Sequence, residues 1–479
     1  MNGHRRIPNF PLFLYNTETR RKERFIPRDT SVLMYTCGPT VYDYAHIGNF
    51  RTYVFEDVLK RTLQTFGYDV KQVMNLTDVD DKTIKGATKQ GVSLDTFTAP
   101  YIRAFFEDIE ILGISPAAEY PRATHYIPQM IEAIDILKKK GRAYSGNDGS
   151  VYFSIDKLDT YGRLCKLSDS HHSHAGTSSS DEYDKDNVCD FTLWKAYDPE
   201  RDGEIYWDSP FGKGRPGWHL ECSVMAMQIL GETIDIHAGG VDNIFPHHEN
   251  EIAQSESLSD KTFVKYWVHS EHLLVNGKKM SKSLGNFYRL KDLLNKGFSG
   301  KEIRYALLQS HYRTQLNFSE KMLKGCKQAV KKLQDFIERI ESIPETKLSE
   351  NQTRTNSDTE LFLRTFAKTM ANDLNVSEAL AALFQYIKKI TDLEQLLGYN
   401  EAVTILGALK EVNRILNVLS FNKGNSIIPT TILELIAERE IARSNKDWKK
   451  SDTLRDMIAE KGFSIEDKVT GYRIKKIEI

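Results

Sequence analysis

The pattern of apolar and polar positions predicts a strand, a helix and a second strand near the start of the chain. The strands are Ser31–Thr36 and Val70–Leu76, and between them Asn49–Leu63 carries apolar residues at helical spacing. A helix that joins two strands in this way favours a parallel pair, which binds ligands beyond the carboxyl ends of its strands. Cys37 and Thr77 follow the two strands, so we expect both side chains at that edge.

A second unit of the same kind appears much later in the chain. Its predicted elements are, in order, a helix, a strand that leads into two glycines, a helix opened by Pro246, and a last strand: Trp218–Leu230, Thr233–His237, His247–Ser257 and Val264–His269. We expect the two units to be the halves of one parallel sheet.

An insertion of mixed composition separates these halves, at about residues 82–214. It contains a predicted helix, Ile127–Lys140, and a polar run, Ser168–Asp184, which we interpret as a mobile loop. Three histidines in this run are metal-ligand candidates, but a solvated loop is the favoured interpretation: His171, His172 and His174.

The pattern becomes helical after about residue 318. Ser319 is a predicted N-cap, and apolar residues then recur at three- and four-residue steps: Leu323, Cys326, Val330, Leu333, Ile337 and Ile340. This spacing gives Cys326 a place in the core. A polar linker, Pro344–Asp358, precedes further amphipathic helices in Leu361–Leu396 and Ala402–Leu419, which predict an antiparallel bundle.

A last unit follows a break at Phe421–Thr430. It is predicted to hold one long helix, Ile432–Lys461, and a hairpin near Phe463–Ile477. On such a helix Arg439, Arg443, Lys446 and Lys450 share one face, with Trp448 nearby. That face is a candidate RNA-binding surface; an ordinary solvated face, with Trp448 docked on the bundle, is the alternative.

Charge and cysteine content narrow the class of protein. The chain has 65 Lys and Arg against 66 Asp and Glu, so neither a wholly basic nucleic-acid coat nor an acidic tail fits. Its cysteines are odd in number and scattered, which indicates a reducing compartment: Cys37, Cys165, Cys189, Cys222 and Cys326. Since no apolar run approaches membrane-spanning length, we expect a cytoplasmic enzyme without membrane contact.

Two segments are suited to binding phosphate. Gly38–Asn49 opens the first helix with His46 and Gly48, where backbone N–H groups and an imidazole can meet a phosphate. A histidine in an ordinary turn is the alternative. The lysine-rich loop Lys278–Asn286 follows the last sheet strand and can reach a triphosphate.

Four further residues have the chemistry of a metal site. His247 and Glu251 are four residues apart, so on a helix they share a face, and Cys37 and Cys222 supply sulfur. Sequence spacing leaves open the alternative of two buried cysteines and a surface pair. The sheet model, which places Cys37 at the carboxyl edge, favours a zinc site.

The two phosphate-binding segments resemble the signatures of class I aminoacyl-tRNA synthetases. His46-Ile47-Gly48-Asn49 is similar to the HIGH motif, with Asn49 in place of its second histidine, and Lys279–Ser283 matches KMSKS. The resemblance implies a Rossmann-like fold, an aminoacyl-adenylate intermediate and Mg²⁺ with the ATP. It assigns catalysis to His46, Lys279 and Lys282, and ATP binding to these residues together with Gly48, Asn49, Ser281 and Ser283.

Within this class, the segments CGPTVYD, GWHLECS and FPHHENE resemble the cysteinyl-tRNA synthetase family. The resemblance implies one zinc ion on Cys37, Cys222, His247 and Glu251, and the substrates L-cysteine, ATP and tRNA(Cys). Zinc would select the substrate thiol over the hydroxyl of serine, so that no editing domain is needed. We place Thr77, Trp218 and His237 in the substrate pocket, and we expect a monomer.

The expected fold class is α/β: a Rossmann-like parallel-sheet catalytic domain split by an inserted domain, then an α-helical bundle and a small C-terminal α+β unit. The expected divisions are 1–81 (catalytic domain, first half), 82–214 (connective insertion), 215–290 (second half with the KMSKS loop), 291–343 (stem-contact region and connecting helix), 344–425 (anticodon-binding type bundle) and 426–479 (small tRNA-binding unit).

Two rival functions remain on sequence grounds. One is a ligase that passes the cysteinyl-adenylate to the amine of a small sugar, although such relatives lack a long RNA-binding tail. The other is a non-catalytic zinc-dependent protein that binds RNA or senses amino acids. The intact KMSKS motif and the four metal-ligand candidates argue against the second.

Overall fold

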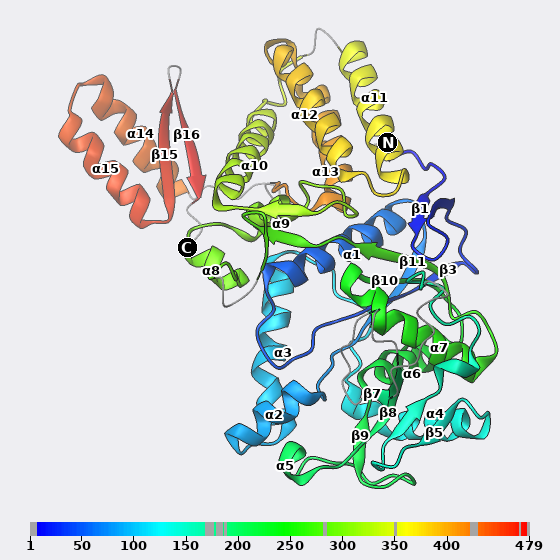
Figure 1. Cartoon of the computed structure of the whole chain (residues 1–479). Helices are drawn as coiled ribbons and strands as arrows, with labels where there is room; N and C mark the ends of the chain where they lie inside the picture. The colour runs from blue at the N-terminus through cyan, green and yellow to red at the C-terminus, as the bar shows by residue number, and fades with distance from the viewer. Residues whose placement is uncertain are drawn as a thin grey trace. The chain divides into compact units, whose positions relative to one another are not determined.

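The protein is represented by a computed structural model that describes residues 7–167, 177–178, 185, 189–280, 285–348, 352–421, 430–468 and 471–476. The chain divides into two compact units, Met1–Leu419 and Ser420–Ile479 (Figure 1). Among the described residues, no helix combines the length and the apolar character needed to cross a membrane.

The first unit is built around a four-stranded parallel sheet in the order β11–β10–β3–β4. The strands are β3 (Ser31–Thr36), β4 (Asp69–Met74), β10 (Ile234–Gly240) and β11 (Val264–Ser270). Two strands come from each predicted half, and β3 pairs with β10, so the prediction of one sheet from two halves is confirmed. From β3 the chain continues to β4 on one side of the sheet, and from β10 it continues to β11 on the other side. Between β3 and β10 the connections therefore leave in opposite directions, which places a crevice beyond the carboxyl ends of these two strands.

Three helices pack against this sheet: α1 (Ile47–Thr65), α6 (Trp218–Leu230) and α7 (Glu249–Ser259). Right-handed crossovers put α1 and α7 on opposite faces, because β3 leads outward to β4 while β10 leads outward to β11 in the other direction. The helix predicted at His247–Ser257 is differently bounded, since a π-helical turn (Ile244–His248) contains His247 and α7 continues to Ser259. An N-terminal hairpin, β1 (Phe13–Asn16) and β2 (Arg21–Arg24), lies beside β11.

The insertion folds into helices and a small mixed sheet with the order β5–β6–β8–β7, and β9 pairs with β8. Its elements are α2 (Asp81–Gln90), α3 (Leu94–Ile111), η1 (Ala123–Tyr126), α4 (Ile127–Lys139), β5 (Ala143–Ser145), β6 (Val151–Phe153), η2 (Ile155–Lys157), β7 (Thr177–Ser178), β8 (Asp190–Ala196), α5 (Pro199–Asp202) and β9 (Gly214–Pro216). Most of the predicted loop Ser168–Asp184, with its three histidines, lies outside the described residues.

The chain after the central sheet forms a small three-stranded sheet, of β12 (Leu273–Val275), β13 (Lys278–Lys279) and β14 (Leu316–Phe318), and a series of helices. They are α8 (Leu290–Asn295), α9 (Gly300–Leu307), α10 (Glu320–Glu341), α11 (Gln352–Ala371), α12 (Val376–Asp392), η6 (Glu394–Leu396) and α13 (Tyr399–Leu416). Ser319 caps α10 as predicted, since its side chain accepts a hydrogen bond from the Met322 N–H, and Cys326 is buried.

The predicted linker Pro344–Asp358 is wrong in its second part, because α11 already begins at Gln352. The first turns of this helix are polar, and polar residues in the first turns of a helix resemble a linker in sequence.

The second unit contains α14 (Thr430–Ser444), α15 (Trp448–Glu460) and the predicted hairpin, β15 (Phe463–Lys468) with β16 (Gly471–Lys476). The single helix predicted over Ile432–Lys461 is wrong. Lys446 has a φ of 60°, a left-handed conformation that ends a helix, and Asp447 caps α15 by accepting a hydrogen bond from the Lys450 N–H.

Candidate active site

The four metal-ligand candidates meet at the carboxyl edge of the central sheet. Cys37 follows β3, Cys222 lies on α6, His247 lies in the π-helical turn and Glu251 lies on α7. Their ligand atoms all lie within 4.8 Å of one another. Two thiols, an imidazole and a carboxylate at this spacing fit a tetrahedral zinc ion. Cys37 is partly exposed as a residue, but at the cluster it is buried together with Cys222, His247 and Glu251.

The electrostatics of this cluster suit a cation. A hydrogen bond from the Cys37 thiol lowers the pKa of Cys222 to about 6, against the effect of burial. Burial alone would raise the pKa of Glu251, but the charges of His237 and His247 outweigh it and hold that pKa at about 2. A thiolate and a carboxylate therefore face one another in a buried space at neutral pH, and their charges outweigh burial and raise the pKa of His247 to about 10.

A second grouping of side chains shares two members with the first. Cys37, His237, His248 and Glu251 also lie within 4.8 Å of one another. The Nε2 atom of His237 is 3.0 Å from Glu251 Oε2, and the Nε2 atom of His248 is 3.3 Å from Cys37 Sγ. Sequence analysis placed His237 in the pocket but missed His248; its position beside His247 in the HHENE run was the available signal.

Aromatic rings hold the histidines of this region in place. Trp218 stacks on His247 with ring centroids 4.2 Å apart, and the Nδ1 atom of His219 is 3.0 Å from Nδ1 of His247. An outer partner of this kind orients a ligating imidazole. The predicted pocket residue Trp218 thus borders the metal-ligand cluster and is partly exposed. Sequence analysis missed His219, although it directly follows Trp218.

Thr77, the third predicted pocket residue, follows β4 and is buried. Its backbone pairs with Thr40, and its hydroxyl accepts a hydrogen bond from the Asn75 side-chain amide at 3.0 Å. Thr77 therefore helps hold the segment that follows Cys37.

The HIGH-like segment forms the N-terminus of α1. His46 is the N-cap, and its Nδ1 accepts a hydrogen bond from the Asn49 N–H. The Asn49 carboxamide oxygen in turn accepts the His46 N–H at 3.1 Å. The residue that departs from the family motif thus closes a reciprocal capping box. The Ile47 N–H donates to the Tyr288 carbonyl at 3.0 Å, which leaves the Gly48 N–H and the helix dipole suited to an anion.

Part of the KMSKS segment lies against this helix end. A Cβ at Gly48 would be 3.1 Å from the Met280 side chain, and His46 forms an isolated β-bridge with Arg289. Phe287 packs edge-on against the His46 ring. The two signature segments, far apart in sequence, are therefore neighbours in the fold. Lys279 is exposed on β13, whereas Ser281, Lys282 and Ser283 lie outside the described residues.

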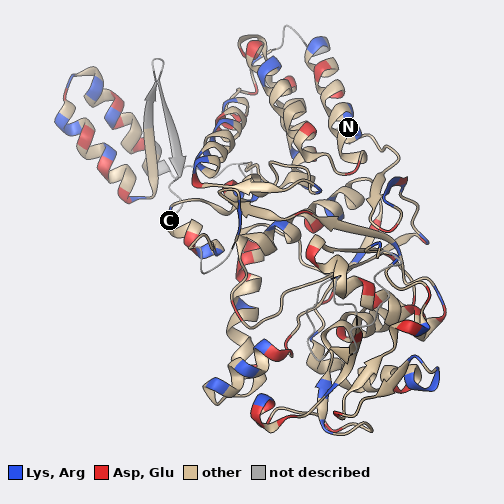
Figure 2. Ribbon diagram, in the orientation of Figure 1, with Lys and Arg blue, Asp and Glu red and all other residues tan. Residues whose placement is uncertain are grey.

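The predicted basic stripe of the second unit is not a single surface. Arg439 is only 1% exposed, and its side chain lies within reach of Glu440. Lys446 sits in the break between α14 and α15, so the four cations do not follow one helix face. Trp448 remains 59% exposed. Figure 2 shows acidic and basic residues interspersed along the ribbons of both helices.

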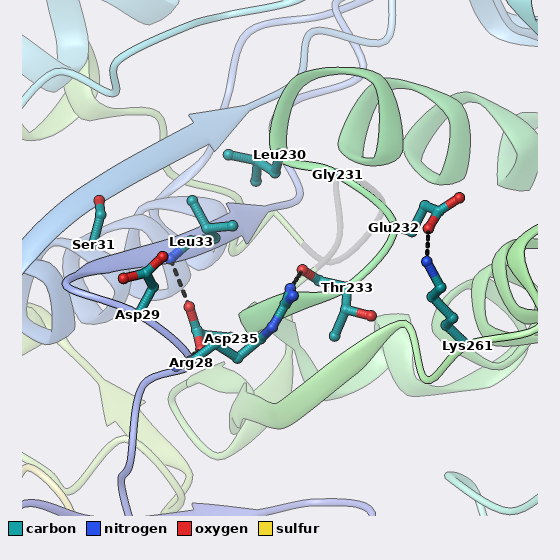
Figure 3. Close-up of a pocket in the computed structure, with 10 residues that line it drawn as sticks. All are labelled: Arg28, Asp29, Ser31, Leu33, Leu230, Gly231, Glu232, Thr233, Asp235 and Lys261. Atoms are coloured by element: carbon teal, nitrogen blue, oxygen red, sulfur yellow. Dashed lines mark hydrogen bonds and ion pairs between the residues drawn. The ribbon is translucent and has the colours of Figure 1, made fainter.

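A cavity of about 280 Å³ lies at the amino ends of β3 and β10, away from Cys37 (Figure 3). Asp235 accepts hydrogen bonds there from the Arg28 and Leu33 N–H groups. Lys261 pairs with Glu232 at the rim. Because these charges are engaged with the protein itself, the cavity has the character of a structural crevice.

Comparison with known proteins places this chain in a family. The family model for the class I (C) tRNA synthetase catalytic domain matches residues 25–328. The cysteine–tRNA ligase of Chlamydia caviae is 59% identical over 470 residues, covering 97% of this chain and 98% of that protein. The cysteine–tRNA ligase of Protochlamydia amoebophila is 54% identical, over 99% of this chain and 100% of the relative.

Solved structures show the same fold at low sequence identity. A methionyl-tRNA synthetase of Mycobacterium tuberculosis, bound by methionyl-adenylate, superposes with a TM-score of 0.61 at 13% identity, over 81% of this chain and 92% of that one. The family model covers most of the chain and the curated relatives align over nearly all of it, so the chain belongs to the class I cysteinyl-tRNA synthetases.

Proposed function

We propose that this chain activates L-cysteine with ATP to cysteinyl-adenylate and transfers the cysteinyl group to the 3′-terminal adenosine of tRNA(Cys). The observation that carries this proposal is the cluster of Cys37, Cys222, His247 and Glu251 at the edge of the sheet where α1 also begins. A sulfur-binding site next to a phosphate-binding helix end is what the activation of cysteine requires.

The cluster supports specificity for the thiol. One zinc ion held by these four residues would bind a thiolate far better than the hydroxyl of serine, which is a poorer ligand with a much higher pKa. A pocket based on shape alone discriminates weakly between such similar side chains.

Four protein ligands normally make a closed site, so one of them is expected to yield when cysteine binds. Glu251 is our candidate, because His237 lies 3.0 Å from its Oε2 and would hold the released carboxylate. The Trp267 ring stacks on His237 at a centroid distance of 4.7 Å and supports that orientation.

We assign ATP to the N-terminus of α1. The His46 ring lies beside Gly48 at this helix end, and Lys279 belongs to the segment that packs near it through Met280. Lys282, Ser281 and Ser283 complete the assignment from the sequence motif, and Mg²⁺ enters with the nucleotide. Adenylation then depends on two things: alignment of the carboxylate of the substrate cysteine with the α-phosphate of ATP, and stabilisation of the negative charge on the departing pyrophosphate.

The remaining assignments are proposals of the same kind. We retain the six-part division given above, with residues 344–425 and 426–479 contacting tRNA and the protein acting as a monomer. In the second unit, exposed Trp448 and Lys450 are the better RNA-contact candidates, because Arg439 is buried.

Zinc analysis combined with cysteine-dependent pyrophosphate exchange tests the function. We expect about one zinc per chain, exchange with cysteine but not with serine, and loss of both zinc and exchange in Cys222→Ser. The matched control is Cys326→Ser, the same substitution at a buried cysteine of α10 outside the cluster. Full cysteine exchange by metal-free Cys222→Ser would contradict the proposal.

A second arm of the same experiment separates the rivals. Formation of cysteinyl-tRNA when tRNA(Cys) is added distinguishes the synthetase from a ligase that uses a small amine. A zinc-binding protein without exchange activity would support the non-catalytic alternative. The match to tRNA ligases along 97% of the chain favours the synthetase.

A further inference from the structure

A buried line of hydrogen bonds leads away from the metal-ligand cluster. Its first contact joins Cys37 Sγ to His248 Nε2 at 3.3 Å. The second joins His248 Nδ1 to His269 Nε2 at 2.8 Å, and the third joins His269 Nδ1 to Thr17 Oγ1 at 2.7 Å. Exposure of His248, His269 and Thr17 is 0%, 4% and 4%, so water does not replace these partners.

The geometry of these contacts determines which atom donates in each hydrogen bond. Two ring nitrogens 2.8 Å apart need one donor and one acceptor, so His248 and His269 share a single proton at that contact. In the part of the chain that the structure describes, the Thr17 hydroxyl has no hydrogen-bond partner besides His269 Nδ1. If every hydrogen bond ran in the opposite direction, His269 would donate to Thr17, and the buried hydroxyl proton of Thr17 would have no acceptor, at a cost of about 1–3 kcal/mol.

Thr17 therefore donates to His269 Nδ1, and His269 donates from Nε2 to His248 Nδ1. His248 then carries its proton on Nε2, the atom that faces Cys37 Sγ. A nitrogen that carries a proton has no lone pair for a metal ion. This tautomer removes His248 from the ligand set and leaves the grouping with Cys222 and His247 as the metal site.

We propose that Thr17, His269 and His248 act as a positioning relay, which donates a hydrogen bond to the Cys37 thiolate and keeps His248 off the metal. The proposal rests on the metal site of the proposed function. An N–H donated to a thiolate stabilises its negative charge and so favours the deprotonated form that a metal ion binds.

Packing supports the relay by holding its rings. Trp267 lies parallel to His269, with an interplanar angle of 3° and a centroid distance of 6.3 Å, and it contacts His248 at 5.0 Å. The Trp267 carbonyl accepts a hydrogen bond from the backbone N–H of Thr17 at 2.8 Å, which fixes the start of the relay against β11.

Thr17→Val in the full-length protein is the test, with Thr17→Ser as the control that keeps the hydroxyl. Zinc affinity is measured by competition with a chelator, and the thiolate-to-metal charge-transfer band is recorded after cobalt substitution. We expect about tenfold weaker zinc binding and a shifted band in Thr17→Val, the lower end of outer-partner effects because Thr17 acts through two rings. Thr17→Ser should match the wild type.

A second pair of variants, at His269, tests the relay independently in case Thr17→Val does not fold. His269→Gln retains an N–H donor toward His248, whereas His269→Leu does not, so only the leucine variant should shift the band. A wild-type protein that binds no zinc would refute the metal site itself. Zinc binding by the wild type, with both readouts unchanged in Thr17→Val and His269→Leu, would refute the relay alone.

Discussion

At the scale of single residues, the departure from the family motif has a structural explanation. Asn49 accepts the His46 N–H while His46 Nδ1 accepts the Asn49 N–H, so the pair caps α1 reciprocally. At the adjacent position 48 a glycine is required, because neighbouring side chains leave no space for a Cβ. A Cβ there would lie 2.9 Å from the His46 ring and 3.1 Å from Met280, a contact that couples the two signature segments.

Gly48→Ala should therefore slow adenylation by about 10- to 100-fold, because it displaces His46 and the KMSKS segment from each other. Steady-state pyrophosphate exchange should show the change in kcat and in the KM for ATP, with zinc content unchanged.

The control is Gly325→Ala on α10, where an added Cβ meets nothing within 4 Å. This variant should keep full activity and gain about 0.5–1 kcal/mol of stability, since alanine favours a helix. Equal activity of the two variants would contradict the proposed contact.

At the scale of elements, one buried ion pair ties α1 to the helical region. Asp57 on α1 lies 2.5 Å from the Arg304 guanidinium on α9, and both side chains are 0% exposed. Arg304 Nε also donates to the Leu416 carbonyl at the end of α13, and Asp57 accepts the Ser115 N–H. Helix α1, the helical region of α9 and α13, and the insertion segment at Ser115 thus meet at this ion pair.

Asp57→Asn should cost about 3–5 kcal/mol of unfolding free energy, because it leaves the Arg304 charge buried without a counter-ion. Urea denaturation of the variant and the wild type measures this difference. The control is the same substitution in an exposed ion pair on α10, which Lys331 and Asp335 form. Asp335→Asn should cost less than about 1 kcal/mol, because solvent screens that pair.

The same buried pair predicts a pH dependence. Burial raises the pKa of Asp57, but the charges of Arg304 and Arg61 outweigh it and leave the pKa below its ordinary value. A lowered carboxyl pKa stabilises the fold above the unfolded value of about 4, and the contribution is lost as pH falls through the folded value. The stability gap between wild type and Asp57→Asn should therefore narrow below about pH 4; a gap independent of pH would contradict this account.

At the scale of the whole molecule, the insertion and the second half of the sheet share one hydrophobic core. Met130 of α4 and Trp194 of β8 belong to the same buried cluster as Met225 of α6 and Trp267 of β11. Glu249 on α7 strengthens this connection by accepting the backbone N–H groups of three insertion residues: Gly162, Leu164 and Cys165. The insertion is therefore an integral part of the catalytic unit.

The second unit, Ser420–Ile479, has its own small core, built from Ile432, Ile436, Ile458, Phe463 and Ile465. A chain that ends at Leu419 should retain cysteine-dependent pyrophosphate exchange and lose most of its charging of tRNA(Cys). Parallel assays of exchange and aminoacylation measure the two steps. Equal loss of both activities would contradict the proposed division of labour.

Local patterns determined much of the fold. The boundaries of β3 and α6 agree with the predicted ranges, and the apolar periodicity of α10 placed Cys326 in the core. Such features depend on contacts between residues close in sequence, and the parallel sheet followed from the helical connection between β3 and β4. The signature segments likewise carried the family assignment, since each is a contiguous run.

Tertiary structure alone decided where distant side chains meet. His248, His269 and Thr17 come from three elements, and their hydrogen bonds arise only after β11 and the N-terminal hairpin lie together. The break at Lys446 depended on a backbone conformation that helical spacing does not reveal. Sequence thus determined the elements and the chemical groups available, whereas the packing of segments remote in the chain decided which groups form the site, because those contacts have no local pattern.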